Sequence, residues 1–256
     1  MNTQPQRKFK ILLIGDSCVD AYQFGTVNRI SPEAPVPVFE PEREVIRGGM
    51  AANVFENLKM LGCEVTPMLG VGGRKTRLID SRYGQQILRI DEDQRSPPIR
   101  IKSRIPQTYD AVVISDYNKG AVDYKLIREV RRHYVGPVFV DTKKPDLAKF
   151  ADCFVKINER EYQARKTVNN HLIVTLGERG AEYHANGVTQ CFPAHKVEVS
   201  DVCGAGDTFL AAVTYKYLST GDISRSIEFA LAAAAVTVQH LGVYAPTLEE
   251  INAIIG

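Results

Sequence analysis

Short apolar segments alternate with helix-forming segments along this chain of 256 residues. Five segments have the length and composition of buried strands: residues 10–14, 111–114, 138–140, 153–156 and 172–175. Amphipathic patterns predict helices over 50–61 and 123–133, and residues 232–238 predict a buried helix because small and apolar residues surround it. This alternation is typical of a mainly parallel sheet covered by helices, so we predict an α/β fold in a single domain, 1–256.

Two segments interrupt the alternation. Residues 24–47 hold four prolines among short extended pieces, which favours edge strands or a stiff flap over a central strand. Residues 76–91 have two extended halves around Tyr83 and Gly84, a pattern that predicts a hairpin. We expect the two segments to form a small β lid that projects from the main domain.

The run Asp201–Asp207, DVCGAGD, precedes a helical pattern over 208–218. Gly204 and Gly206 let the backbone approach a ligand closely, and the first N–H groups of the helix are left unpaired. Such a loop suits a phosphoryl group in transfer, with Asp207 accepting a proton from an attacking hydroxyl. The same spacing also fits a plain helix cap after a glycine turn, and both interpretations stay open.

Polar residues or glycine follow each predicted strand. They are Asp16, Asp116, Asp141, Lys143, Asn158 and Gly177. Each one alone fits a turn former or a helix cap. Ligands bind beyond the carboxyl ends of parallel strands, however, so the succession favours a cleft at that edge of the sheet.

Composition excludes several classes of function. The formal net charge of +2 gives no reason to expect a nucleic-acid partner. Five widely spaced cysteines without a C-x-x-C pair suggest neither a disulfide framework nor a zinc site, which fits a reducing cytoplasm. We find no targeting segment, and the most apolar run, 229–238, is too short to cross a membrane.

Four motifs together resemble the ribokinase-like, or PfkB-type, carbohydrate kinases. They are Gly48-Gly49-Met50-Ala51-Ala52-Asn53, Asn158-Glu159-Arg160-Glu161, Thr175-Leu176-Gly177-Glu178-Arg179-Gly180 and the Asp201–Asp207 run, in the order of that family. The resemblance implies a three-layer sandwich whose mainly parallel central sheet is flanked by helices, plus the small β lid. It also implies ATP and Mg²⁺ as cofactors, with a monovalent cation as a further candidate.

A closer resemblance is to the heptose 7-phosphate kinases, which phosphorylate the anomeric hydroxyl of their sugar. It lies in residues 29–38 (RISPEAPVPV), 85–91 (QQILRID), 115–120 (SDYNKG) and 140–143 (VDTK). Generic sugar kinases do not usually share these segments. The resemblance therefore implies a sugar phosphate as substrate and a homodimer that pairs through the lid.

The resemblance assigns a role to each candidate residue. Asp207 is the expected base, and Gly204, Ala205 and Gly206 the expected cradle for the transferred group. Candidate substrate-binding residues are Asp16, Gly48, Gly49, Asn53, Arg29, Asp116, Lys119 and Lys143, with the three basic residues meeting the phosphate of the sugar. Candidate ATP-binding residues are Asn158, Glu161, Thr175, Gly177, Gly180 and Asp201. Asn158 and Glu161 are also expected to act on magnesium through its waters.

The chain departs from these families at three places. After residues 70–73 it passes almost directly to 75–77, where relatives have a further helix and strand. Leu231 stands where the heptose kinases tend to have asparagine, and Val243 where a smaller or more polar residue is expected. Two rival hypotheses therefore stay open: a kinase for another sugar or a nucleoside, and a degenerate fold that binds sugar or nucleotide without turnover.

Overall fold

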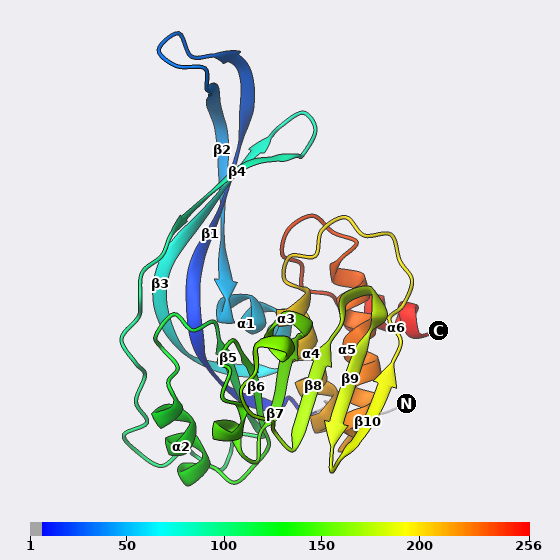
Figure 1. Cartoon of the computed structure of the whole chain (residues 1–256). Coiled ribbons are helices and arrows are strands. Elements are labelled where there is room, and N and C mark those ends of the chain that lie inside the picture. The colour runs from blue at the N-terminus through cyan, green and yellow to red at the C-terminus, as the bar shows by residue number, and fades with distance from the viewer. Residues whose placement is uncertain (1–6) are drawn as a thin grey trace.

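The computed structural model describes residues 7–256 and contains one sheet of ten strands. Figure 1 shows a helix-covered body from which one end of the sheet projects. The strands are β1 (Lys10–Ile30), β2 (Pro37–Met50), β3 (Glu64–Asp80), β4 (Gln86–Glu92), β5 (Ala111–Asp116), β6 (Val138–Thr142), β7 (Phe154–Asn158), β8 (His171–Thr175), β9 (Ala181–Ala185) and β10 (Val188–Phe192). The helices are α1 (Ala51–Met60), α2 (Tyr124–His133), α3 (Glu159–Ala164), α4 (Ala205–Thr220), α5 (Ile223–Thr237) and α6 (Leu248–Ile255), with 3-10 turns η1 (Leu147–Phe150) and η2 (Gly177–Arg179).

The strand order β10-β9-β8-β7-β6-β5-β1-β3-β4 confirms the predicted mainly parallel sheet, with β2 also paired to β1. Strands β3, β1, β5, β6, β7 and β8 run parallel, whereas β9 and β10 form an antiparallel margin. The carboxyl ends of the parallel strands therefore meet at one edge, where the predicted cleft residues lie.

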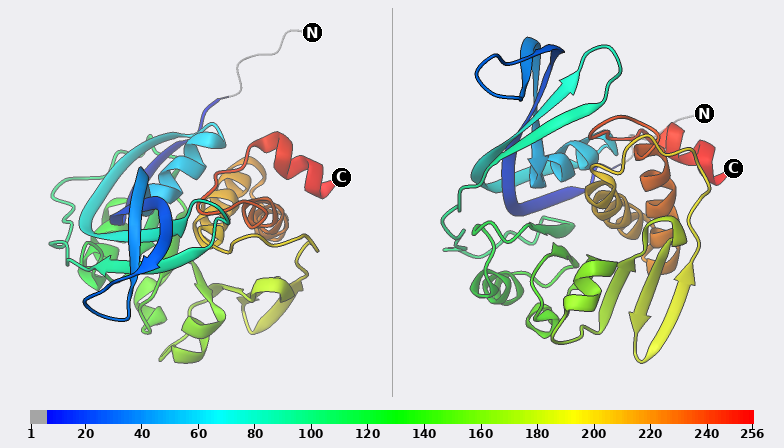
Figure 2. Two further views of the ribbon diagram at one scale, coloured as in Figure 1. Left: turned by 90° about the horizontal axis from the view of Figure 1, so that it is seen from above. Right: turned by 45° about the horizontal axis from the view of Figure 1, so that its top comes forward.

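Helices cover both faces of the central sheet, which confirms the three layers. Side chains alternate along a strand, so Ile11 and Leu13 of β1 join one buried cluster while Leu12 and Ile14 join the other. The first cluster also takes side chains from α1, α4, α5 and α6, and the second from α2 and η1. Figure 2 shows the two groups of helices from two further sides. No helix between residues 7 and 256 is long and apolar enough to span a bilayer.

Strands β1 and β3 continue out of the body and form the spine of a projecting sheet, which we define as residues 19–50 and 74–92. They pair in parallel from Lys10 and Glu64 as far as Gly25 and Asp80, with one irregularity after Ser17. The sequence pattern predicted that the first strand would end at residue 14. Its apolar run stops there because buried polar residues, Asp16, Ser17 and Asp20, follow in the same strand, not because the strand ends.

Two antiparallel partners complete the projecting sheet. β2 pairs with the outer part of β1, and β4 pairs with β3 from Arg74 opposite Glu92 to Ile79 opposite Gln86. The chain turns between β3 and β4 at Gly84, whose φ of 68° lies in the left-handed region that favours glycine. β3 runs without interruption through residues 70–77, where the relatives were expected to insert a further helix and strand.

Close approach at Gly15 brings three elements together beneath the cleft. A Cβ placed on Gly15 would collide with the carbonyl oxygen of Ser115 on β5 and would lie 2.8 Å from Cβ of Ala51 on α1.

We therefore predict that Gly15→Ala lowers the free energy of unfolding by about 1–3 kcal/mol, because the backbone must shift to admit a methyl group. Urea denaturation followed by circular dichroism measures the change. Val188→Ala, at an exposed position of β10, is the control, and equal stability of the two variants would contradict the packing argument.

Candidate active site

A buried carboxylate lies in the first turn of α4. The side chain of Asp207 is only 4% exposed. Its Oδ2 accepts a hydrogen bond from Nδ2 of Asn53 on α1 at 3.0 Å, and its Oδ1 accepts one from the Tyr117 hydroxyl at 2.7 Å. Each carboxylate oxygen retains a second lone pair. Asp207 is therefore held in place by two neighbours and can still accept a proton from a third group.

The surroundings of Asp207 adjust its affinity for a proton. Burial raises the pKa of Asp207 to about 6, although the hydrogen bonds from Asn53 and Tyr117 oppose the shift, and the charge of Asp141 adds to it. Burial and the charge of Asp207 raise the pKa of Tyr117 well above its ordinary value, so Tyr117 keeps its proton and remains a hydrogen-bond donor. At neutral pH Asp207 is thus largely ionised with a pKa close to the ambient pH, as general base catalysis requires.

The start of α4 presents backbone N–H groups without a side-chain cap. Gly204 precedes the helix with a φ of 82°. No side chain accepts a hydrogen bond from the N–H groups of the first helical turn. A Cβ on Gly204 would lie 2.9 Å from Nδ2 of Asn53, so a larger residue would disturb the partner of Asp207. Ala205 and Gly206 line a cavity of about 1020 Å³. Two of the three cradle residues predicted from sequence therefore border a volume large enough for a ligand, and Gly204 lies just before them.

A buried ion pair lies beside the cradle. Nζ of Lys156 on β7 is 2.7 Å from Oδ2 of Asp141 on β6, and a Cβ on Gly206 would lie 2.9 Å from the same Nζ. Burial alone would lower the pKa of Lys156, but the charge of Asp141 and its hydrogen bond raise it. Lys156 therefore stays charged next to the loop. We did not select it from sequence, although a lysine within the apolar run of β7 was a usable signal.

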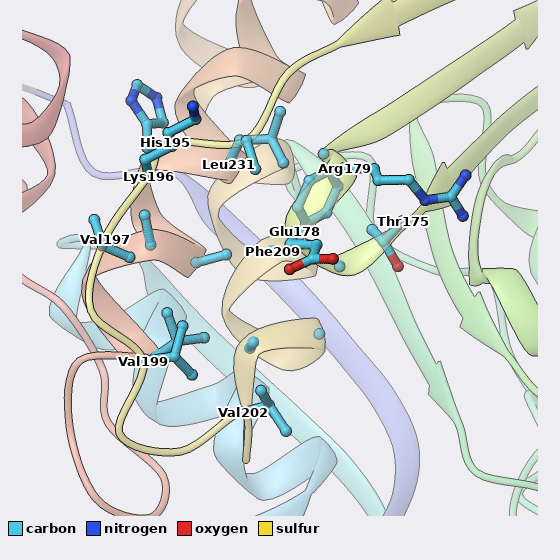
Figure 3. A pocket seen from close by; sticks show the side chains of 18 residues that line it. Thr175, Glu178, Arg179, His195, Lys196, Val197, Val199, Val202, Phe209 and Leu231 are labelled. Carbon is cyan, nitrogen blue, oxygen red and sulfur yellow. The ribbon is translucent and has the colours of Figure 1, made fainter.

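The cavity extends from the cradle between the turn after β8, the segment before α4, and α5. Figure 3 shows Phe209 of α4 and Leu231 of α5 on its apolar side, with Thr175, Glu178 and Arg179 near the β8 turn. Gly177 and Gly180 also line it. Three predicted ATP-binding residues, Thr175, Gly177 and Gly180, are thus brought together. Asn158, Glu161 and Asp201 do not line this cavity.

Asn158 and Glu161 form a capping box at the start of α3. Oδ1 of Asn158 accepts from the Glu161 N–H at 2.9 Å, and Oε2 of Glu161 accepts from the Asn158 N–H at 2.8 Å. The other oxygen of Glu161 pairs with Nζ of Lys143 at 3.1 Å. Among residues 7–256 no three histidine, cysteine or acidic side chains converge as a ready-made metal site. Burial raises the pKa of Asp141, and the charge of Glu161 adds to that shift.

Asp201 organises the loop before α4. Its Oδ1 accepts from the Cys203 N–H at 3.0 Å and its Oδ2 from the Gly242 N–H at 2.9 Å. Backbone N–H groups of Ser200 and Asp201 also bind the carbonyl of Val238. Asp201 therefore ties the loop to the segment that follows α5.

Two predicted substrate-binding carboxylates do not face the cleft. Asp16 is fully buried and accepts three backbone N–H groups, from Tyr117, Lys119 and Ala121, at 2.8–3.1 Å. The carboxylate of Asp116 accepts hydrogen bonds from the Lys144 ammonium, the Thr142 hydroxyl and the Asn118 N–H. Their role is to shape the loop that carries Tyr117. A polar residue after a strand looks the same in sequence whether it binds a ligand or a neighbouring loop.

The three predicted phosphate-binding cations lie apart from one another. Arg29 is the next-to-last residue of β1, at the outer end of the projecting sheet, and pairs with Glu40. It is nine residues beyond Asp20 on the same strand, roughly 30 Å at about 3.3 Å per residue. Lys119 pairs with Asp93 at 2.7 Å, and Lys143 lies over the Tyr117 ring and pairs with Glu161. The structure does not gather these cations at one site.

Asp20, which was not selected from sequence, lies against the predicted glycine pair. It lies on β1 beyond the core, and a Cβ on Gly49 would be 2.6 Å from its Oδ2. Gly48 and Gly49 end β2 immediately before α1, so this glycine pair lets the backbone pass close to Asp20. We missed Asp20 because the first strand was expected to end before it. Two aspartates four residues apart were the available signal.

Comparison with known proteins assigns this arrangement to a class. Residues 138–251 match the pfkB family of carbohydrate kinases. The structure superposes on the ribokinase from Thermotoga maritima with a TM-score of 0.71, covering 97% of this chain and 99% of that one at 17% identity. The Arabidopsis thaliana ribokinase complexed with ribose and ATP gives a TM-score of 0.69 over 97% of this chain and 99% of that one, at 15% identity. The fold is that of the ribokinases.

Within that class, the chain contains a PfkB carbohydrate kinase domain, matched over residues 138–251. It is similar to the bifunctional protein HldE from Nitratiruptor sp., with 31% identity over 302 aligned residues. The alignment covers 96% of this chain and 64% of that protein. The chain thus spans a little under two thirds of the length of this relative.

We predict that Tyr117→Phe raises the pKa of Asp207 above its value of about 6, because the lost hydrogen bond favours the ionised carboxylate. Asp207 would then release its proton at higher pH, and any activity that needs the ionised form would begin at higher pH. The ¹³C signal of the Asp207 carboxyl carbon, followed through a pH titration, measures the midpoint. Tyr124→Phe, in α2, is the matched control. An unchanged or lower midpoint in Tyr117→Phe would contradict the assignment.

Proposed function

We propose that this protein is an ATP-dependent sugar kinase that phosphorylates the anomeric hydroxyl of a heptose 7-phosphate. The observation that carries the kinase proposal is Asp207, a buried and oriented carboxylate beside uncapped backbone N–H groups. The heptose assignment is supported by similarity to HldE and by the segments that resemble heptose 7-phosphate kinases.

In the proposed reaction the sugar hydroxyl oxygen forms a bond to the γ-phosphorus of ATP as the bond from that phosphorus to the β,γ-bridging oxygen breaks. Asp207 accepts the hydroxyl proton, and ADP leaves with the bonding electrons. The N–H groups of Gly204, Ala205 and Gly206 stabilise the charge on the moving group, and Lys156 adds a positive charge beside them. Asn53 orients Asp207 and, with Asp20, offers hydrogen bonds to sugar hydroxyls.

The nucleotide is proposed to occupy the cavity between the β8 turn and α5. Its triphosphate would point to the cradle, where Ala205 and Gly206 line the wall. Thr175, Gly177 and Gly180 would lie along it at the β8 turn. Leu231 and Phe209 provide an apolar surface for the base, so the base is held by contact area rather than by an amide side chain at position 231.

The residues present fit a magnesium ion bound through water. Mg²⁺ keeps several waters and needs only one or two carboxylates besides substrate phosphates. The charge of Glu161 contributes to the pKa shifts of Asp141 and Lys156. Asn158 is hydrogen-bonded to Glu161 in the capping box. These two residues would hold the hydrated ion, which would supply charge neutralisation for the phosphates.

The projecting sheet is proposed to act as a lid and as a homodimer contact. A lid would exclude water from phosphoryl transfer. The outer strands carry exposed apolar side chains, among them Ile46, Leu88 and Ile90, and exposed strand edges of this kind pair readily with a second copy.

We expect the double change Leu88→Asp and Ile90→Asp to convert the dimer to a monomer, because two charges would have to be buried in the contact. Sedimentation velocity on the wild type and the variant measures the mass. Val188→Asp, at an exposed position on β10, is the control and should leave the mass unchanged. A monomeric wild type would reject the proposed dimer.

Asp207→Asn should lower turnover by about two decades or more, because the amide keeps the shape of the carboxylate but does not accept the proton. The assay combines pure protein, ATP, Mg²⁺ and heptose 7-phosphate, with coupled detection of ADP. Asp222→Asn is the matched control, since asparagine caps helix α5 as well as aspartate does.

Equal turnover in wild type and Asp207→Asn would reject the base assignment. A panel of ribose, fructose, nucleosides and their phosphates, tested on the wild type, identifies the acceptor. Binding of ATP without ADP release on any acceptor would instead favour a protein that binds its ligands without turnover.

A further inference from the structure

One face of the projecting sheet carries three cations where it joins the body. Arg47 of β2 and Lys75 of β3 are the direct strand partners of Asp20 on β1, and Arg77 of β3 is the partner of Tyr22. Directly paired residues, and residues two apart on one strand, share a face of a sheet. Arg47, Lys75 and Arg77 therefore share a face with Asp20 and Tyr22.

This face is turned toward the loop that begins the candidate active site. Nη2 of Arg77 is 3.8 Å from Sγ of Cys203, the residue before the first cradle glycine. Nη1 of Arg47 donates to the carbonyl oxygen of Val243 at 2.6 Å. Val243 in turn packs against Gly204, where an added Cβ would be 3.2 Å from its Cγ1. The cations thus lie above the same loop that positions Asp207.

The charges on this face do not balance. Nη1 of Arg77 is 2.6 Å from Oδ1 of Asp20, and the two side chains are only 12% and 7% exposed. For Arg47 and Lys75, by contrast, no carboxylate oxygen of residues 7–256 lies within 4.0 Å. On β4, Asp91 and Arg89 are the strand partners of Lys75 and Arg77 and form an ion pair with each other, so they cancel and the face stays cationic.

An unused hydrogen-bonding group accompanies the cations. The guanidinium carbons of Arg77 and Arg47 lie 5.1 and 5.8 Å from the centre of the Tyr22 ring. Tyr22 is 7% exposed, and its hydroxyl makes no hydrogen bond. Buried hydroxyls are rarely left unpaired, so this group is an independent sign of a missing polar partner. Two guanidinium groups, an ammonium group and a hydroxyl suit a phosphate monoester, which accepts bidentate hydrogen bonds from arginine.

We propose that Arg77, Arg47 and Lys75 bind the phosphate that the acceptor sugar already carries, which makes the enzyme specific for sugar phosphates over neutral sugars. The proposal rests on the sugar kinase function above. It assigns the phosphate to the base of the lid, in place of Arg29, Lys119 and Lys143. Asp20, which pairs with Arg77 in the free protein, would share that arginine with the phosphate and turn its other oxygen to the sugar.

The test compares a phosphorylated with a neutral acceptor. In Arg77→Leu, kcat/KM for heptose 7-phosphate should fall about 30-fold further than kcat/KM for the unphosphorylated heptose, since only the phosphorylated acceptor loses a charge-assisted pair of bonds to its phosphate. Arg77→Lys should recover only part of the loss because an ammonium group does not form the bidentate contact. Arg82→Leu is the matched control, an exposed arginine of the same sheet paired with Asp80, and should stay near wild type.

Three results would overturn the proposal. In the first, the wild type uses neutral heptose as well as the 7-phosphate. In the second, Arg77→Leu impairs both acceptors equally. In the third, it raises KM for ATP alone, which would mean that these cations hold a nucleotide phosphate instead.

A binding measurement separates this inference from the kinase proposal. Calorimetric titration with heptose 7-phosphate, without nucleotide, should show binding to the wild type that weakens by about 30-fold in Arg77→Leu and hardly at all in Arg82→Leu. If the wild type shows no turnover but this pattern holds, the kinase function fails and the phosphate site stands. If affinity is equal in all three folded proteins, as judged by circular dichroism, the phosphate site is refuted.

Discussion

Continuous pairing of β1 with β3 is the constraint on which the rest of the structure depends. The same two strands form one side of the buried sheet and the spine of the projecting sheet. Their hydrogen bonds fix where Asp20 and Arg77 sit relative to the core, because strand register leaves little freedom to slide. α1 follows β2 directly at Gly49 and Met50, so the position of Asn53 is determined by the same sheet.

The candidate active site places unlike electrostatic environments next to one another. Asp207 is buried with two hydrogen-bond donors and one distant carboxylate, which holds its pKa near 6. Lys156 is equally buried but keeps its charge through Asp141. The projecting sheet adds Arg47 and Arg77, whose guanidinium groups reach Val243 and Cys203 beside the loop before α4. A phosphoryl group moving between a nucleotide and a sugar phosphate would therefore meet positive charge and N–H groups around a single proton acceptor.

Much of this could be predicted from local patterns. The buried strands that begin near residues 111, 138, 153 and 172 stand out because both faces of a parallel sheet are apolar. The DVCGAGD run stands out because its turn needs the left-handed backbone conformation that favours glycine. The errors share a cause. Asp16 and Asp116 are polar residues after strands, but their partners are backbone N–H groups and a lysine from elsewhere in the chain, which no local pattern reveals.

The sequence by itself determined the α/β class, the helix that follows the glycine loop and the presence of Asp207, because strand composition, helix periodicity and glycine spacing are local properties. Only the tertiary structure decided which polar groups meet. It joined Asn53, Tyr117 and Asp207, separated in the chain by at least 64 residues. It put Arg29 at the outer end of β1 and brought Arg47 and Arg77 to the loop before α4. Those outcomes depend on strand register and on side-chain contacts between distant segments, which only the folded chain brings together.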